Sequence, residues 1–157
     1  MSVRGLMNKE ITAPFFYPDI NNLHDPLLMH DMKNAVDRII NQITNNKSIL
    51  IYGDYDVDGT TATSLLYLFF QSIDVDVHYF IPNRESEGYG LSEKGIEYAN
   101  YIGANLVITC DCGITAFNEV EFASSLNIDV IITDHHKQAD RLPNALAILN
   151  PNKKCCS

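Results

Sequence analysis

The hydrophobic pattern of this chain changes its period several times along the sequence. Short stretches rich in Val, Ile and Leu predict buried strands, and the segments of about 10–15 residues between them carry apolar positions at helical spacing. Strands that alternate with helices indicate βαβ units, so we expect an α/β fold with a parallel β-sheet and flanking helices. The expected strands are residues 48–53, 75–81, 105–110, 129–133 and 146–149, and the expected helices are residues 61–72, 92–102 and 116–127.

Two further segments precede the first strand. Residues 25–46 predict one continuous helix, with Asp25 as its N-cap and Pro26 in its first turn. Residues 1–25 predict an irregular arm that packs on the body of the domain, which we expect to span residues 26–157. The apolar positions at helical spacing in the predicted helix are Leu28, Met32, Val36, Ile39 and Ile43.

Acidic residues follow three of the expected strands at the point where each strand ends. In an open parallel sheet, ligands bind beyond the carboxyl ends of the strands, so these side chains are expected to meet at one edge. Any one of these acids could serve as a turn residue or a helix cap, but their shared position favours a ligand site. The residues are Asp54, Asp56 and Asp58 after the first strand, Asp111 after the third, and Asp134, His135 and His136 after the fourth.

Composition narrows the possible function classes. The formal net charge of −9 argues against a nucleic-acid binder that relies on bulk positive charge. Every apolar run is shorter than the roughly 18 residues that a membrane span needs, and the N-terminus shows no secretory signal. We therefore expect a cytoplasmic protein without membrane contact. Neither a disulfide framework nor a zinc site fits the spacing of Cys110, Cys112, Cys155 and Cys156.

The clustered carboxylates suggest a metal centre, because like charges repel one another unless a cation lies among them. Divalent cations take oxygen ligands, and a histidine ligand shifts the preference from Mg²⁺ toward Mn²⁺. Two such cations would activate a water and clamp a phosphoryl group for in-line displacement. A second interpretation takes "DVDGT" at residues 56–60 as the first motif of a dehalogenase-type phosphatase, in which Asp56 would attack phosphorus covalently.

Four motifs, in this order, resemble those of the DHH phosphoesterase superfamily. They are "GDYDVDGTTATSLL" from residue 53, "NRESEGYGLS" from residue 83, "ITCDCGIT" from residue 108 and "ITDHH" from residue 132. Within the superfamily the chain is most similar to the RecJ branch of single-strand-specific 5′→3′ DNA exonucleases. The N-terminal arm and "AILNPN" from residue 147 also resemble that branch. The resemblance covers essentially the whole chain and implies a hydrolase of phosphodiester bonds that uses two divalent cations, Mn²⁺ or Mg²⁺.

The resemblance also implies roles for the residues of these motifs. Much of the superfamily has a histidine where Tyr52 stands, and Asp54 would take its place here. His136 would face the substrate phosphate, and Asp134 would orient the neighbouring histidines. The implied metal ligands are Asp54, Asp56, Asp58, the bridging carboxylate Asp111, and His135; the implied catalytic residues are Asp111, His135 and His136.

The connection after the second strand carries candidate substrate-binding residues. The guanidinium of Arg84 matches phosphate oxygens in a fork. Gly88 and Gly90 would let the backbone approach a ligand closely. Tyr89 would either stack on a base or pack against the protein.

Part of the family's machinery has no counterpart in this sequence. DHH enzymes have a further metal-binding aspartate after the "DHH" element and then a second, substrate-binding domain, and residues 137–157 match neither. We therefore expect a DHH domain truncated at its C-terminus that by itself binds metal weakly and hydrolyses little.

The resemblance finally implies a substrate and partners. The substrate is single-stranded DNA, degraded from its 5′ end in repair or recombination, and the candidate partners are a single-stranded-DNA-binding protein and a helicase. The alternatives are a DHH phosphoesterase for small substrates (a nanoRNase, a cyclic-dinucleotide phosphodiesterase or a pyrophosphatase) and a non-catalytic DHH-fold scaffold.

Overall fold

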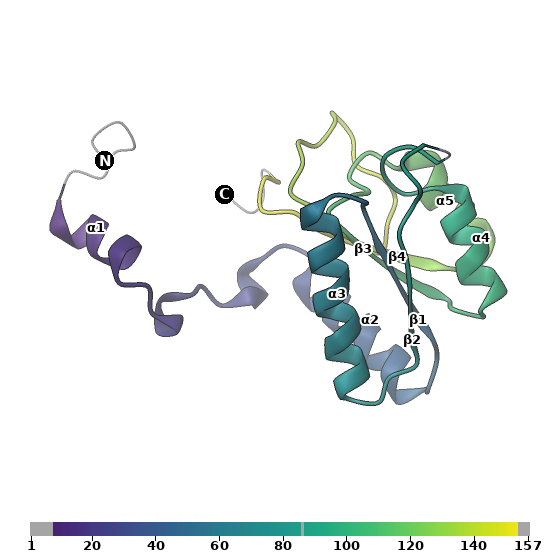
Figure 1. Ribbon diagram of the computed structural model, residues 1–157, viewed down its shortest axis with the longest axis horizontal. Helices are drawn as coiled ribbons and strands as arrows, with labels where there is room; N and C mark the ends of the chain where they lie inside the picture. The colour runs from purple at the N-terminus through teal and green to yellow at the C-terminus, as the bar shows by residue number, and fades with distance from the viewer. Residues whose placement is uncertain (1–7, 86, 154–157) are drawn as a thin grey trace.

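A five-stranded parallel sheet forms the centre of the computed structural model, which describes residues 8–85 and 87–153 (Figure 1). The strand order is β2-β1-β3-β4-β5, and every neighbouring pair is parallel. The expected parallel sheet and its strands are therefore confirmed. Two of the four cysteines, Cys155 and Cys156, lie outside the described residues. The strands are β1 (Ile49–Gly53), β2 (Val77–Phe80), β3 (Leu106–Cys110), β4 (Asp129–Thr133) and β5 (Ala147–Leu149).

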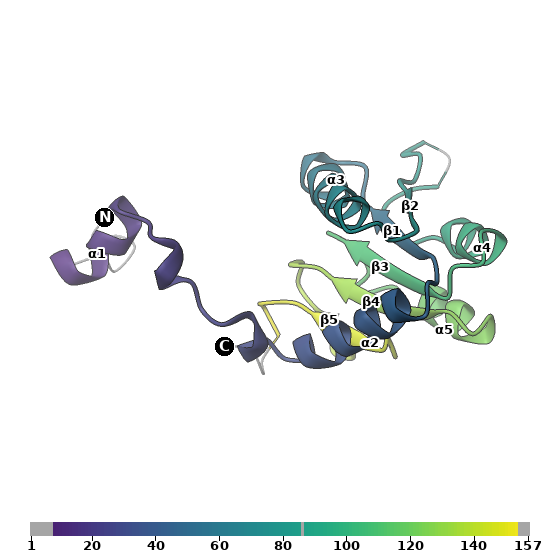
Figure 2. The same ribbon diagram turned by 90° about the horizontal axis from the view of Figure 1, so that it is seen from below.

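Helices cover both faces of the sheet (Figure 2). Alternate residues of each strand point to opposite faces, so Ile51 packs in one core with α2 and α3, and Leu50 packs in a second core with α4 and α5. The central strands are buried on both sides, as expected for a parallel sheet. The helices are α2 (Met32–Thr44), α3 (Val57–Ser72), α4 (Glu93–Tyr101) and α5 (Phe117–Ser125). Within the described part of the chain, none of the helices combines the length and the apolar character needed to cross a membrane.

The continuous helix predicted for residues 25–46 is wrong in its first part. Asp25 caps only a short 3-10 helix, η3 (Pro26–Leu28), by accepting a hydrogen bond from the Leu27 N–H. Helix α2 starts at Met32, because Asp31 adopts a left-handed backbone conformation with φ of 67°. Tertiary contacts hold Asp31 there, since its carboxylate accepts hydrogen bonds from β5 and from the segment that follows β5. As a result Leu28 is largely exposed rather than part of the core.

Helix α3 begins four residues earlier than the predicted helix of residues 61–72. Its N-cap is Asp56, whose Oδ1 accepts a hydrogen bond from the Gly59 N–H at 3.0 Å. Asp58 therefore lies in the first helical turn instead of in a preceding loop. The carboxylates that follow β1 therefore have a structural role in starting α3, in addition to making this connection negatively charged.

The part of the N-terminal arm that the structure describes, residues 8–25, is more regular than expected and does not pack on the body (Figure 1). It contains α1 (Lys9–Phe16) and the 3-10 helix η2 (Ile20–Asn22), and it projects away from the sheet. Local hydrogen bonds define its conformation, as where Asp19 Oδ1 accepts from the Asn21 N–H. Several of its large apolar side chains are more than half exposed, namely those of Phe15, Phe16, Tyr17, Ile20 and Leu23.

Candidate metal centre at the carboxyl edge of the sheet

The last residues of β1, β3, β4 and β5 lie side by side in the parallel pairing. The residues that follow these strands therefore form one row, which we call the edge row: Asp54, Asp111, Asp134 and Asn150. The backbone N–H of each aspartate donates to the last carbonyl of the next strand, so the ladder continues through the row. The sheet thus delivers three carboxylates to one edge, as the strand pattern predicted.

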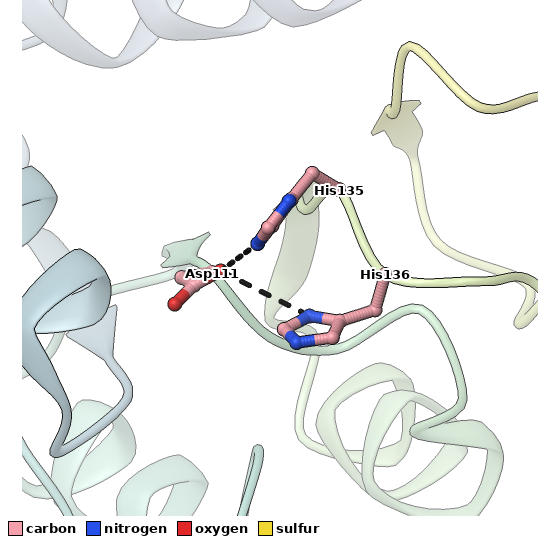
Figure 3. Close-up of side chains that lie close together, drawn as sticks. All are labelled: Asp111, His135 and His136. Carbon is pink, nitrogen blue, oxygen red and sulfur yellow. Dashed lines mark ion pairs between the residues drawn. The ribbon is translucent and has the colours of Figure 1, made fainter. Parts of the chain in front are cut away.

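One aspartate of the row and two histidines form a tight cluster (Figure 3). Potential ligand atoms of Asp111, His135 and His136 all lie within 4.8 Å of one another. His135 Nε2 lies 2.9 Å from Asp111 Oδ1, and His136 Nδ1 lies 3.9 Å from the same oxygen. Asp111 has a left-handed backbone, with φ of 63°, a conformation that non-glycine residues adopt mostly where a site requires it.

Two buried carboxylate oxygens at this edge have no hydrogen-bond donor in the part of the chain that the structure describes. Although His135 lies close, the geometry is not that of a hydrogen bond, and Asp111 Oδ1 has no donor among the described residues. The same is true of Oδ1 of Asp54, which is only 1% exposed. Leaving such groups unsatisfied is costly, and cations bound at this edge would compensate for the missing donors. The residues present therefore fit a divalent metal ion.

The raised pKa of Asp111 also favours the interpretation that a cation binds at this edge. Burial raises the pKa of its carboxyl group above the ordinary value, and the nearby Asp56 carboxylate raises it further. The positive charge of protonated His135 or His136 would act in the opposite direction. Because the charged form of Asp111 is disfavoured in the metal-free protein, a bound cation would restore it.

Asp134 contacts both the backbone and the ring of His136. Its Oδ1 accepts a hydrogen bond from the His136 N–H at 2.9 Å and lies 2.8 Å from Nδ1 of the same ring. Its other oxygen accepts from the Ile114 N–H at 3.0 Å. Among the contacts of the described residues, those of Asp134 hold His136 and not His135. The hydrogen bond to Asp134 raises the pKa of His136 above the ordinary value.

The raised pKa of His136 predicts a pH dependence. A histidine with a raised pKa in the folded state contributes stability that is fully present below the unfolded value of about 6.5 and is lost as pH rises through the folded pKa. We expect imidazole NMR titration of the metal-free protein to give a pKa above 6.5 for His136. The stability advantage over a His136→Gln variant should be fully present below about pH 6.5 and should shrink as the pH rises through the raised pKa of His136. A titration midpoint at or below the ordinary value would contradict the role assigned to Asp134.

The three aspartates between the end of β1 and the first turn of α3 lie beside the cluster rather than within it. Among the described residues, the tight group of potential ligand atoms does not include Asp54, Asp56 or Asp58. Asp56 uses Oδ1 for the helix cap. Asp58 lines an open hollow of about 500 Å³ together with Asp111 and His135. It therefore faces the same space as the cluster.

The connection between β2 and α4 reaches the cluster through Tyr89. The Tyr89 hydroxyl lies 3.2 Å from Nδ1 and 3.3 Å from Nε2 of His136, and it donates to the Asp111 carbonyl at 3.3 Å. Burial and the carboxylates of the edge row raise the pKa of Tyr89, so its hydroxyl stays protonated. The ring itself remains 55% exposed beside the site.

The same connection brings Arg84 toward the site through an aromatic neighbour. The Arg84 guanidinium lies over the ring of Tyr55 at 5.4 Å, and Tyr55 contacts Tyr89 edge-on. Gly88 and Gly90 have φ of 78° and 90°, which favours glycine at both positions. Within the described chain nothing would crowd an added Cβ at either glycine, so backbone conformation rather than close packing explains them.

Tyr52, in β1, is hydrogen-bonded to the connection between β2 and α4. It is fully buried and donates its hydroxyl hydrogen to the Gly90 carbonyl at 2.8 Å. We expect Tyr52→Phe to lower the free energy of unfolding by about 1 kcal/mol and to speed amide hydrogen exchange in residues 87–91. Urea unfolding and exchange would be compared with Tyr101→Phe, which changes a ring that is 86% exposed. Equal behaviour of the two variants would contradict the anchoring role.

Asn150 is a site residue that the sequence pattern did not predict. It is fully buried at the end of the edge row, and its Nδ2 donates to the His136 carbonyl at 2.9 Å. The available signal was its position directly after β5, which pairs with the strand that precedes the histidines. An uncharged residue at a strand end does not by itself indicate a metal site, as a carboxylate does, although its side chain can orient the residues of such a site.

Comparison with known proteins agrees with this arrangement. Residues 48–157 match the DHH family, N-terminal domain. The chain belongs to the DHH family. The matched DHH region contains the whole edge row, both histidines and the connection that carries Tyr89.

Several of the proteins to which the chain is similar are RecJ exonucleases. The chain is 40% identical over 154 residues to the single-stranded-DNA-specific exonuclease RecJ of Bacillus subtilis (strain 168), covering 98% of this chain and 20% of that protein. It is 42% identical over 127 residues to RecJ of Escherichia coli (strain K12), covering 80% and 22%. A crystal structure of exonuclease RecJ bound to manganese matches with a TM-score of 0.74 and 32% identity, covering 80% of this chain and 32% of that one. The chain spans about a fifth of the length of these curated relatives.

Proposed function

We propose that this chain forms part of the catalytic domain of a metal-dependent phosphodiesterase that degrades single-stranded DNA from its 5′ end. The observation that carries the proposal is the cluster of Asp111, His135 and His136, next to two buried carboxylate oxygens that lack donors within the described chain. The similarity to single-stranded-DNA-specific exonucleases supports the choice of substrate.

Two divalent cations would be held at the edge of the sheet. The candidate ligands are Asp111 and His135, with Asp54 beside them and Asp56 and Asp58 on α3. A mixed set of carboxylates and imidazole suits Mn²⁺, with Mg²⁺ as the alternative, and a similar RecJ was crystallised with manganese. When bound, the cations would supply an activated water and positive charge for the phosphoryl oxygens.

The chain's own residues would orient the substrate. Asp134 holds His136 through Nδ1 and favours its protonated form, which can donate a charged hydrogen bond to a phosphoryl oxygen. Arg84 offers a second cationic donor near the site, and the exposed ring of Tyr89 offers a surface on which a base can stack.

Two alternatives from the same family make different predictions. A small-substrate DHH phosphoesterase would use the same metal chemistry. A non-catalytic scaffold would have no need of the buried Oδ1 atoms of Asp54 and Asp111, which have no donor among residues 8–85 and 87–153. A dehalogenase-type phosphatase fits less well, because membership of the DHH family does not suggest it and Asp56 is engaged as a helix cap.

The proposed function also suggests partners and a compartment. A single-stranded-DNA-binding protein and a helicase would present the substrate, and the cytoplasm is the compartment that we propose.

A substrate panel tests the proposal. The protein that carries this chain would be incubated with Mn²⁺ and 5′-labelled single-stranded or duplex DNA, a dinucleotide, a cyclic dinucleotide and pyrophosphate. We expect early release of labelled mononucleotide from single strands and little from the duplex. Preferential cleavage of a small substrate would favour the first alternative, and no cleavage together with no Mn²⁺ binding would favour the scaffold.

A further inference from the structure

The proposed metal centre depends on two consecutive histidines that belong to no helix or strand. Strand β4 ends at Thr133, and residues 134–146 form an irregular connection to β5. Asp134 fixes the N–H of His136. The carbonyls of His135 and His136 are not part of the sheet ladder, so they need hydrogen-bond donors from elsewhere.

Two asparagine side chains supply these donors. Asn150 Nδ2 donates to the His136 carbonyl at 2.9 Å, and Asn152 Nδ2 donates to the His135 carbonyl at 2.5 Å. We infer that Asn150 and Asn152 are positioning residues that fix the His135–His136 backbone, and with it the direction of both imidazoles. The inference deepens the proposed function and rests on it.

The asparagines are themselves held in place by a tight turn. Asn150 is fully buried at the end of the edge row. Its Oδ1 accepts a hydrogen bond from the Asn152 N–H at 2.8 Å, and its carbonyl accepts from the Lys153 N–H at 3.1 Å. Pro151 lies between the two asparagines and fixes its own φ. The side chains are therefore preorganised before any ligand arrives.

A buried lysine ties this turn to the rest of the domain. Lys153 is 4% exposed, and its Nζ donates to Asp31 Oδ2 at 3.0 Å and to the Ile148 carbonyl at 2.9 Å. Asp31 directly precedes α2, so the turn is linked both to β5 and to the start of that helix. The histidines thus rest on a support that spans distant parts of the sequence.

The chemistry of the contacts requires amides. Each histidine carbonyl needs a donor, while Asn150 must also accept a hydrogen bond through its side chain. Aspartate would place a second acceptor, and a negative charge, against the carbonyl. Alanine would leave the carbonyl without its donor.

The test uses Asn152→Ala, because Asn152 is exposed and its loss should leave the fold intact. The matched control is Asn45→Ala, which also removes an exposed asparagine Nδ2 that donates to a backbone carbonyl, here that of Asn41 at the end of α2. Calorimetric titration with Mn²⁺ alone, thermal unfolding, and amide hydrogen exchange of residues 134–137 would be measured for both variants and the wild type.

We expect Mn²⁺ affinity to fall about tenfold in Asn152→Ala, as for other residues that orient metal ligands, and to stay unchanged in Asn45→Ala. The thermal midpoints of the two variants should agree, and exchange in residues 134–137 should be faster only in Asn152→Ala. Unchanged affinity in Asn152→Ala would overturn the inference. If even the wild type bound no Mn²⁺, the metal centre would be wrong, and exchange alone would decide whether Asn152 positions the histidines.

Discussion

Replacing Asp111 with asparagine is expected to reduce Mn²⁺ affinity by more than about 100-fold, since loss of a mere orienting residue already costs roughly 10–100-fold. Asp111 combines a charge, a buried oxygen without a donor in the described chain, and closeness to both histidines. Asparagine keeps the shape of the side chain but removes the charge. Calorimetric titration with Mn²⁺ would measure the effect.

A matched control separates this effect from backbone strain. Asp74 also has a left-handed backbone, with φ of 56°, but it is exposed in the turn that precedes β2. Asparagine tolerates this conformation as well as aspartate does, so Asp74→Asn should bind Mn²⁺ like the wild type. Equal affinities of Asp111→Asn and Asp74→Asn would remove Asp111 from the metal centre.

Replacing Gly59 with alanine is expected to lower the free energy of unfolding by about 3 kcal/mol, at the upper end of ordinary overpacking. An added Cβ would lie 2.5 Å from the carbonyl oxygen of Asp54 and 2.7 Å from its backbone nitrogen. These atoms belong to the backbone of the edge row and cannot rotate away. The first turn of α3 and the backbone of Asp54 would have to separate.

Helix propensity alone would make Gly59→Ala more stable than the wild type by about 1 kcal/mol. A loss of stability would therefore point to the close contact with Asp54. Ser64→Ala, at an exposed position of the same helix, is the control and should change stability by less than about 0.5 kcal/mol. Urea unfolding of both variants would measure the difference. A Gly59→Ala protein as stable as the wild type would contradict the tight contact between α3 and Asp54.

The sheet could be predicted because each strand carries its own local signal. The β-branched runs of β1, β3 and β4 are buried on both faces, and parallel strands with intervening helices place their carboxyl ends at one edge. That rule predicts that Asp54, Asp111 and Asp134 lie together at this edge. The family resemblance, rather than the pattern, implied that Asp134 orients the neighbouring histidines; among the described residues, its histidine contacts are with His136.

Other features depend on contacts that the local sequence does not encode. Asp31 interrupts the predicted helix because it bonds to β5 and Lys153, which are more than 100 residues away. The arm was expected to find a surface on the body, yet its conformation follows local caps. The roles of Asn150 and Asn152 appear only when β5 is placed beside β4.

The most direct test of the metal centre is anomalous scattering from crystals of this chain grown with Mn²⁺. The account predicts an anomalous peak within coordination distance of the Asp111 carboxylate and the His135 imidazole. A peak only elsewhere on the surface, or none at the carboxyl edge of the sheet under saturating Mn²⁺, would contradict it.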